Sequence, residues 1–481
     1  MKERHMKYTA IISLLLLLLL SCQKKEPKIK TINGVWESVG SGWVLQIEDS
    51  TSYSLFDITS ISCLTSRQAS LTELIESLSL RKDTLYLNNG VMTYAFTRSG
   101  DLPKSCTDLP SEEEKKDPMY NFEVFAETVN KHYAFLELNG INWETLYEQQ
   151  KGKLSKNPSS TTLYLVLEET LELLNDNHAF LEATDEVYEA VEQLTPEPQE
   201  SATQESLQEY GDFVVANLVA EHHLKEDMTS KDSWLVKWGM MEDTIGYVQV
   251  KAMWLYADLD IPEKLIEENG YVDAYVETFH TMYEGEYVKK EVAGISKIMD
   301  SIMNDLSHAA SIVIDVRFNG GGQDAVNFEI LKRLNSKKRQ IVTAKLKHED
   351  GFSPLQRIYL ESSSTPYIKP VFILTSSQSG SAAESFAIGS MSLPHVKRIG
   401  SSTQGALSTA LEKKLPNGWT FAISNEIYMD NQGNSYENIG VPVDYSLDYP
   451  DDRQTFFRYV AHDLEYDKQT ILKAMSELGS R

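Results

Sequence analysis

The chain has 481 residues, enough for two to four domains that each bury a core of their own. It is 41% hydrophobic and 24% charged, which is ordinary for a globular protein. Its 45 basic and 71 acidic residues give a formal net charge of −26, which argues against nucleic acid as a partner.

Residues 1–21 are predicted to be a signal peptide. A basic start precedes the apolar run "IISLLLLLLL", whose length suits a signal peptide better than a membrane span. The run ends in Leu20-Ser21-Cys22, which resembles a bacterial lipobox with Cys22 as the lipid-modified first residue of the mature chain. A plain signal peptide with an incidental cysteine is the alternative. The lipid would anchor the protein in the bacterial cell envelope, facing the periplasm or the cell surface, without spanning the membrane.

Residues 22–33 are predicted to be a tether, and 34–99 a small all-β domain. Short alternating segments such as "WVLQIED" and "DTLYLNN", separated by turn residues, indicate its strands. A polar, proline-containing linker is predicted over 100–118. Outside the cytoplasm Cys63 and Cys106 can pair, but their spacing alone leaves the disulfide open.

A helical subdomain is predicted over 119–181. Five apolar side chains follow the 3.6-residue period of a helix: Leu163, Val166, Leu167, Leu171 and Leu174. Ser159 or Ser160 can cap its start. The next segment, 182–232, is acidic with little apolar pattern, which predicts an exposed linker or a poorly packed insertion.

Strands and helices alternate from about 233 to 450, which predicts an α/β core. The apolar runs "SIVIDVR" and "PVFILT" are typical of strands in a sheet that is covered on both faces. A helix is expected over 451–481.

Three short stretches carry candidate chemistry. In "LLNDNHAFL", His178 follows an apolar helix, and an imidazole with a pKa near neutrality can act as a general base. In "IDVRFNGGG", a strand ends in three glycines whose amides can face an oxyanion or a phosphate. In "SSQSGSAAESF", Ser381 stands where a buried strand gives way to a helix, whose dipole and first amides stabilise negative charge.

Each stretch also has a plainer interpretation. A lone histidine is more often a capping or packing residue. The glycines can simply form a tight turn between a strand and a helix. A serine at a helix start is usually an N-cap.

Taken in order, the motifs "LNDNHAFL", "IGYVQV", "SIVIDVRFNGGG", "VFILTSSQSGSAAESFAIG", "KRIGSSTQG" and "YENIGVPVD" resemble the tail-specific, or C-terminal processing, family of serine peptidases. The resemblance covers roughly residues 119–450. It implies a crotonase-like, ClpP-related α/β core, with Ser381 as the nucleophile and no metal or other cofactor. It also implies an oxyanion hole formed by the amides of Gly321 and Ala382, with Gly320 as a further candidate.

One departure bears on the mechanism that the resemblance implies. Many members carry a catalytic lysine in a "T-x-G-K" turn, but here the turn is "TQGA" and Ala406 occupies the lysine position. The chain is therefore more similar to the subgroup of the tricorn core and the interphotoreceptor retinoid-binding protein, in which a histidine is the base. This similarity implies His178 as the base, with Asn177 beside it and Glu437 as the distant glutamate, Glu426 being the weaker candidate.

The function implied is that of an exported lipoprotein endopeptidase that cleaves polypeptides through an acyl-enzyme. The alternative is an inactive protein that binds peptides or hydrophobic ligands on the same fold. An acyl-CoA enzyme is a weaker third possibility, because no basic cluster is present to hold a nucleotide diphosphate.

Overall fold

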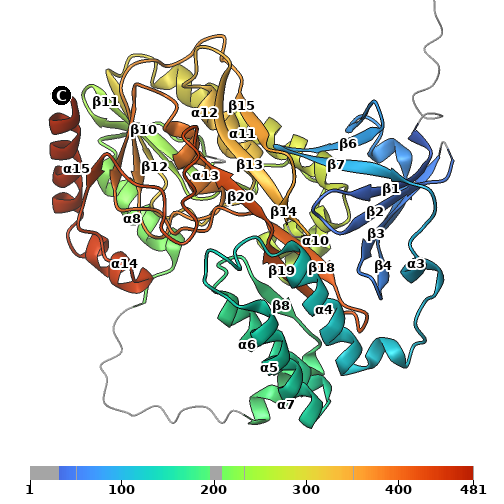
Figure 1. Ribbon diagram of the computed structural model, residues 1–481. Helices are drawn as coiled ribbons and strands as arrows, with labels where there is room; N and C mark the ends of the chain where they lie inside the picture. Colours follow the sequence, from blue (N-terminus) through green and yellow to red (C-terminus); the bar gives the residue numbers. More distant parts are fainter. Residues whose placement is uncertain (1–31, 50, 195–208, 232, 350, 480–481) are drawn as a thin grey trace, which may run out of the picture.

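The computed structural model describes residues 32–479 except 50, 195–208, 232 and 350 (Figure 1). The predicted signal peptide, Cys22 and most of the predicted tether lie outside the described residues. No helix in the described part of the chain is both long and apolar enough to cross a membrane.

The N-terminal part is one antiparallel sheet of seven strands in the order β4-β3-β2-β1-β7-β6-β5. Its strands are β1 Gly34–Ser38, β2 Trp43–Ile47, β3 Ser52–Ile58, β4 Cys63–Ser70, β5 Leu78–Arg81, β6 Thr84–Asn89 and β7 Met92–Ser99. Trp36, Leu45 and Phe96 fill its core. A disulfide between Cys63 and Cys106 joins β4 to the short helix α3 (Lys104–Thr107), so the structure settles the pairing that the spacing left open.

The helical subdomain consists of α4 (Pro118–His132), α5 (Trp143–Lys156) and α6 (Ser160–Leu174). Ser159 caps α6 by accepting the Thr162 amide at 3.1 Å, and all five periodic side chains of this helix are buried. They pack in one apolar cluster with the strand β19 (Thr420–Ser424). β19 pairs with β18 (Ala410–Lys414) on one side and with β8 (Phe180–Glu182) on the other, so the segment that carries His178 joins the core through a sheet.

A sheet of seven strands lies at the centre of the core, in the order β21-β17-β16-β12-β11-β10-β9. The strands from β21 to β11 run parallel to one another, and β10 is antiparallel to both β11 and β9. These strands are β9 Glu226–Asp227, β10 Val236–Glu242, β11 Ile245–Val250, β12 Ser311–Asp315, β16 Val371–Thr375, β17 Val396–Gly400 and β21 Tyr445–Ser446. Alternate residues point to opposite faces, as strand geometry requires. Ile312 and Ile314 enter one apolar cluster, whereas Val313 enters another.

Helices cover both faces of this sheet (Figure 1). One face packs against α11 (Glu284–Asp305), α12 (Asp324–Lys332) and α13 (Ala382–Ser390). The other packs against α8 (Asp212–His223), α14 (Arg453–His462) and α15 (Leu464–Gly479). Burial on both faces confirms the expectation drawn from the unbroken apolar strands.

The remaining elements surround this core. They are α7 Asp185–Leu194, α9 Glu263–Asn269, α10 Tyr271–His280, β13 Arg339–His348, β14 Gly351–Phe352, β15 Gln356–Leu360 and β20 Glu426–Met429. β13 pairs with both β15 and β20.

Two sequence expectations differ from the structure. Within 182–232, which was expected to be a linker or a poorly packed insertion, α8 buries Val215, Ala216, Val219 and Ala220 against the core. Apolar side chains occur on several sides of this helix, so no one-sided stripe marked it in the sequence. The segment 451–481 forms two helices, α14 and α15, rather than one.

The β domain is fastened to the rest of the molecule beside the sheet β18–β19. A buried ion pair joins Lys413 Nζ to Asp57 Oδ1 at 2.6 Å. The hairpin β6–β7 extends over the core, where Asn89 Nδ2 donates to Glu284 Oε2 at 2.6 Å and Tyr94 OH donates to Glu426 Oε1 at 3.2 Å (Figure 1). The β domain therefore contributes to the surroundings of β18 and α11.

Candidate active site

Ser381 occupies a strained turn between β16 and α13. Its φ of 51° and ψ of −120° lie outside the regions that a residue with a side chain usually adopts. Its amide donates to Ala406 O at 3.1 Å and to Glu384 Oε2 at 3.2 Å. The backbone is thus held so that a partly exposed serine stands at the first turn of a helix, the position where a nucleophile gains most from the helix amides.

The neighbouring serines have structural roles. Ser376 Oγ donates to Arg317 O at 2.6 Å, and Ser379 Oγ donates to Val316 O at 2.8 Å. Both bonds tie the serine turn to the end of β12. Within the described part of the chain Ser381 Oγ donates no such bond, which leaves its hydroxyl available for chemistry.

The glycine turn 320–322 lies directly against Ser381. A Cβ built on Gly321 would be 2.6 Å from the Cβ of Ser381 and 3.0 Å from the amide nitrogen of Ala382. The Gly321 amide donates to Asn319 Oδ1 at 2.9 Å, so it is already engaged and does not offer the unused donor that the resemblance implied. Among the described residues, the amides of Gly320, Gly322 and Ala382 have no protein acceptor, which leaves them open to an oxyanion.

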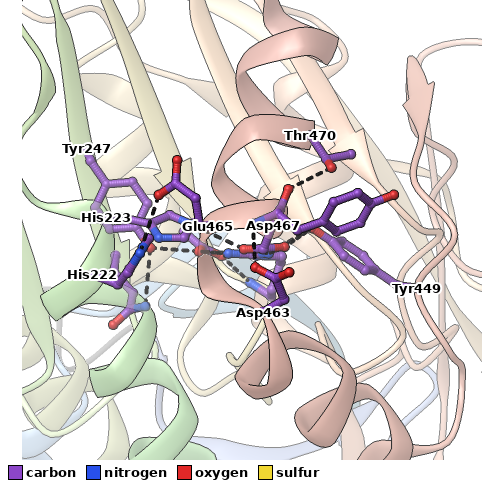
Figure 2. A network of polar contacts seen from close by, with 12 residues as sticks. His222, His223, Tyr247, Tyr449, Asp463, Glu465, Asp467 and Thr470 are labelled. Atoms are coloured by element: carbon purple, nitrogen blue, oxygen red, sulfur yellow. Dashed lines mark hydrogen bonds and ion pairs between the residues drawn. The ribbon is translucent and has the colours of Figure 1, made fainter.

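The start of the glycine turn is held by a buried polar network that reaches the C-terminal helices (Figure 2). Arg317, fully buried, pairs with Asp315 at 2.7 Å and with Asp467 of α15 at 2.8 Å. Asp467 also accepts from Tyr449 OH at 2.8 Å and lies 3.2 Å from His223 Nε2. Removing one partner of such a network leaves an uncompensated buried charge, which typically costs about 3–5 kcal/mol.

His178 reaches the core through the loop between α6 and β8. Asp176 Oδ1 accepts the His178 amide at 2.9 Å and the Ser424 hydroxyl at 2.7 Å, while Oδ2 accepts the Ser424 amide at 2.6 Å. Burial lowers the pKa of His178 below its usual value, with the charge of Asp176 acting in the opposite direction. The imidazole is therefore neutral at neutral pH and able to accept a proton.

His178 and Ser381 line the same pocket, whose volume is about 250 Å³. The other walls are Gly322–Ala325, Leu407–Ala410, Tyr428, part of α11 and the tip of the β6–β7 hairpin from Asn89 to Tyr94. No hydrogen bond joins the two side chains among the described contacts, and His178 Nδ1 is buried without a partner. Such bonds are often absent or long before substrate binds.

Two buried glutamates hold the loop that faces Ser381. Glu384 accepts from Thr403 Oγ1 at 2.6 Å and from the amides of Gly405 and Ala406 at 2.7 and 2.5 Å. Glu437 accepts from the amides of Leu407 and Ser408 at 3.0 and 3.1 Å. Burial, and then the charge of Glu384, raise the pKa of Glu437 to about 8. Glu384 therefore holds the "TQGA" turn itself, and Glu437 holds the two residues that follow it.

Residues 244–447 match the family model described as peptidase family S41. The α/β core of the chain belongs to peptidase family S41. By this match the chain is a serine-type peptidase of the tail-specific protease family. No curated protein matches the chain significantly.

Three solved structures are similar to this chain over about three quarters of its length, with different degrees of structural agreement. A putative peptidase from Parabacteroides merdae has a TM-score of 0.51 at 17% identity, over 73% of this chain and 97% of the other. Mature CPAF in complex with lactacystin has a TM-score of 0.50 at 12% identity, over 76% and 99%. The photosystem II D1 C-terminal processing protease has a TM-score of 0.41 at 14% identity, over 74% and 99%. The predicted family and the predicted α/β fold class are both confirmed.

The S41 core brings some of the sequence-predicted site residues together and leaves others apart. Ser381 and His178 share the pocket, with Ala382 at the helix start. Asn177 Nδ2 lies 3.4 Å from Gly405 O, and Glu437 contacts backbone amides, so neither bonds to the imidazole. Glu426 contacts Tyr94 of the β domain instead.

Sequence reasoning gave no role to several residues that shape this S41 site. Asp176 holds the His178 loop, Glu384 holds the loop beside the nucleophile, and the β6–β7 hairpin walls the pocket. Asp176 stands two residues before the histidine and Glu384 three residues after the serine, so both were visible within the motifs. The hairpin had no local signal, because its partners lie about 200 to 330 residues away in the sequence.

Proposed function

We propose that this peptidase is an exported, lipid-anchored endopeptidase that cleaves polypeptides through an acyl-enzyme. In this mechanism Ser381 is the nucleophile and His178 is the general base. The observation that carries the proposal is that both side chains line one pocket, with Ser381 at a strained helix start and the imidazole kept neutral by burial. Ala406, in place of the family's lysine, is buried and has no group that can accept a proton.

In the proposed reaction, Ser381 Oγ attacks the scissile carbonyl while His178 takes the hydroxyl proton. The tetrahedral oxyanion binds the amide of Ala382 together with a free amide of the glycine turn, Gly320 or Gly322. His178 then returns the proton to the leaving amine, and the acyl-enzyme remains on Ser381. Water, deprotonated by the same imidazole, releases the second product.

Export is supported by two features. The N-terminal sequence has the form of a signal peptide that ends in a lipobox-like cysteine. The disulfide between Cys63 and Cys106 suits an oxidising compartment, because cytosolic proteins rarely keep such bonds.

A fluorophosphonate probe, which reacts only with activated serines, tests the nucleophile. We expect the probe to label the wild type on Ser381 and to leave Ser381→Ala unlabelled. Ser377→Ala is the matched control and should be labelled normally, because Ser377 lies outside the pocket and its Oγ contacts Asp451 O and Gln378 Nε2. A folded wild-type protein that resists the probe would favour the inactive binding protein instead.

The anchor is tested by Cys22→Ser. This variant should move from the membrane fraction to the soluble fraction, while its rate of probe labelling stays that of the wild type. The lipid contributes to membrane binding and not to the peptidase core. Partitioning should therefore change in this variant, whereas probe labelling should not. Unchanged partitioning of Cys22→Ser would contradict the lipoprotein assignment.

A further inference from the structure

The pocket beside Ser381 is acidic, and its one histidine, His178, is kept neutral by burial. Of its lining side chains, Asp324 and Glu284 carry carboxylates, and none is a lysine or an arginine among the described residues that form it. Asp324 accepts only from neutral groups: Ser385 Oγ at 2.5 Å, Tyr428 OH at 3.1 Å and Asn327 Nδ2 at 3.4 Å. Burial raises the pKa of Asp324, as expected for a carboxylate that lacks a counter-ion.

A second carboxylate lies directly behind the pocket wall. Glu426 is 2% exposed, and its Oε1 accepts from the hydroxyl of Tyr94, a lining residue, at 3.2 Å. Its Oε2 is buried without a partner among the described residues. Burial raises the pKa of Glu426 to about 7, and the charge of Asp324 acts in the same direction. In its ionised form this carboxylate, although it does not line the pocket, adds negative potential that favours a cation there.

The other walls suit a long side chain with a charged end. Met92, Val288 and Leu407 offer apolar surface for an alkyl stem, and the rings of Tyr94 and Tyr428 can face a cation. The volume of about 250 Å³ admits one such side chain rather than several.

We propose that this pocket binds the cationic side chain of the substrate residue whose carbonyl Ser381 attacks, so that the peptidase cleaves after arginine or lysine. Asp324 contacts the cation directly, and Glu426 adds negative potential from behind Tyr94. The proposal rests on Ser381 being the nucleophile. It also gives the N-terminal β domain a role, since its β6–β7 hairpin completes the wall of the specificity pocket.

The test compares peptides that differ only in the charge of that residue. Matched fluorogenic peptides with arginine or citrulline before the scissile bond have nearly the same shape, and only arginine is cationic. We expect kcat/KM for the arginine peptide to exceed that for the citrulline peptide by about 100-fold or more. Equal rates for the two peptides would overturn the proposal.

Variants locate the source of the preference. Asp324→Asn and Glu426→Gln should each reduce the ratio of arginine to citrulline cleavage by about 10-fold or more, mainly through a higher KM for arginine. Glu286→Gln is the control, because Glu286 is exposed on α11 outside the pocket and should leave the ratio unchanged. If both variants fold and keep the wild-type ratio of arginine to citrulline cleavage, Asp324 and Glu426 are not the source of the preference. If a variant fails to fold, the comparison of the two peptides on the wild type still tests the proposal.

Fluorophosphonate labelling separates this inference from the proposed function. The probe carries no substrate side chain, so it reports on Ser381 alone. If the probe labels Ser381 but the arginine and citrulline peptides are cleaved equally, the pocket does not select a cationic side chain, and Ser381 remains the nucleophile. Absence of labelling would overturn both.

Discussion

Ser381→Ala and His178→Ala should each lower the rate of peptide cleavage by about 10⁴-fold or more, and the double variant should be little worse than either one. The two side chains act as a unit, because a serine without its base is a poor nucleophile and a base without the serine has nothing to activate. Steady-state kinetics on one fluorogenic peptide, with thermal unfolding to confirm that each variant is folded, measures the effect.

The same pair sets the pH dependence. Because burial lowers the pKa of His178, the imidazole loses its proton below the usual value of about 6.5. The rate of peptide cleavage should therefore rise with pH, with a midpoint below pH 6.5 and a plateau by neutral pH. An unperturbed histidine would instead give a rise over about pH 6–7.5. The residual activity of His178→Ala should lack this acidic limb.

Lysine variants test the alternative that a lysine, rather than His178, is the general base. Lys397 and Lys414 lie near the vacated lysine position in sequence, and their replacement by alanine should leave cleavage unchanged. Near-normal activity in His178→Ala with collapse in either lysine variant would identify a displaced lysine as the base. Lys413 is unsuitable for this test, because its buried pair with Asp57 makes it structural and its replacement should destabilise the fold.

Gly321→Ala should lower cleavage by about 100- to 1000-fold, in the range seen when an oxyanion donor is lost. The added methyl would lie 2.6 Å from the Cβ of Ser381 and 3.0 Å from the Ala382 amide, where the substrate oxyanion must bind. The φ of 114° at this position strains any residue with a side chain as well. The measurement is kcat/KM together with the rate of fluorophosphonate labelling, both of which should fall.

Gly320→Ala is the matched control one residue away. A Cβ at Gly320 meets no atom within 4 Å, and its amide remains available to an oxyanion. This variant should keep most of the activity. Equal activity in the two variants would show that the contact between the glycine turn and Ser381 does not limit the reaction.

The sequence predicted the core of this protein well because its signals are local. Unbroken apolar runs at β12 and β16 indicated a sheet covered on both faces, and the helical period of α6 predicted the side chains that are buried. Ser381 and His178 could be named because each stands in a short motif at the end of a regular element. The order of the motifs along the chain then indicated the family.

The features that the sequence did not predict depend on contacts between distant segments. Tyr94 and Glu426 are 332 positions apart, and no local pattern connects a hairpin of the β domain with a strand of the core. The engaged amide of Gly321 depends on the side chain of Asn319, which a run of glycines does not reveal. The acidic pocket likewise arises from α12, β20 and the hairpin, whose residues meet only after folding.

The network around Arg317 also bears on the order of events during folding. Arg317 contacts Asp467, 150 positions away, and His223 contacts the same carboxylate across 244 positions. Contacts of such length form late, since a long loop must close before they provide any stabilisation. The glycine turn that follows Arg317 is therefore coupled through that side chain to α15. The serine turn shares this coupling, because Ser376 Oγ donates to Arg317 O at 2.6 Å.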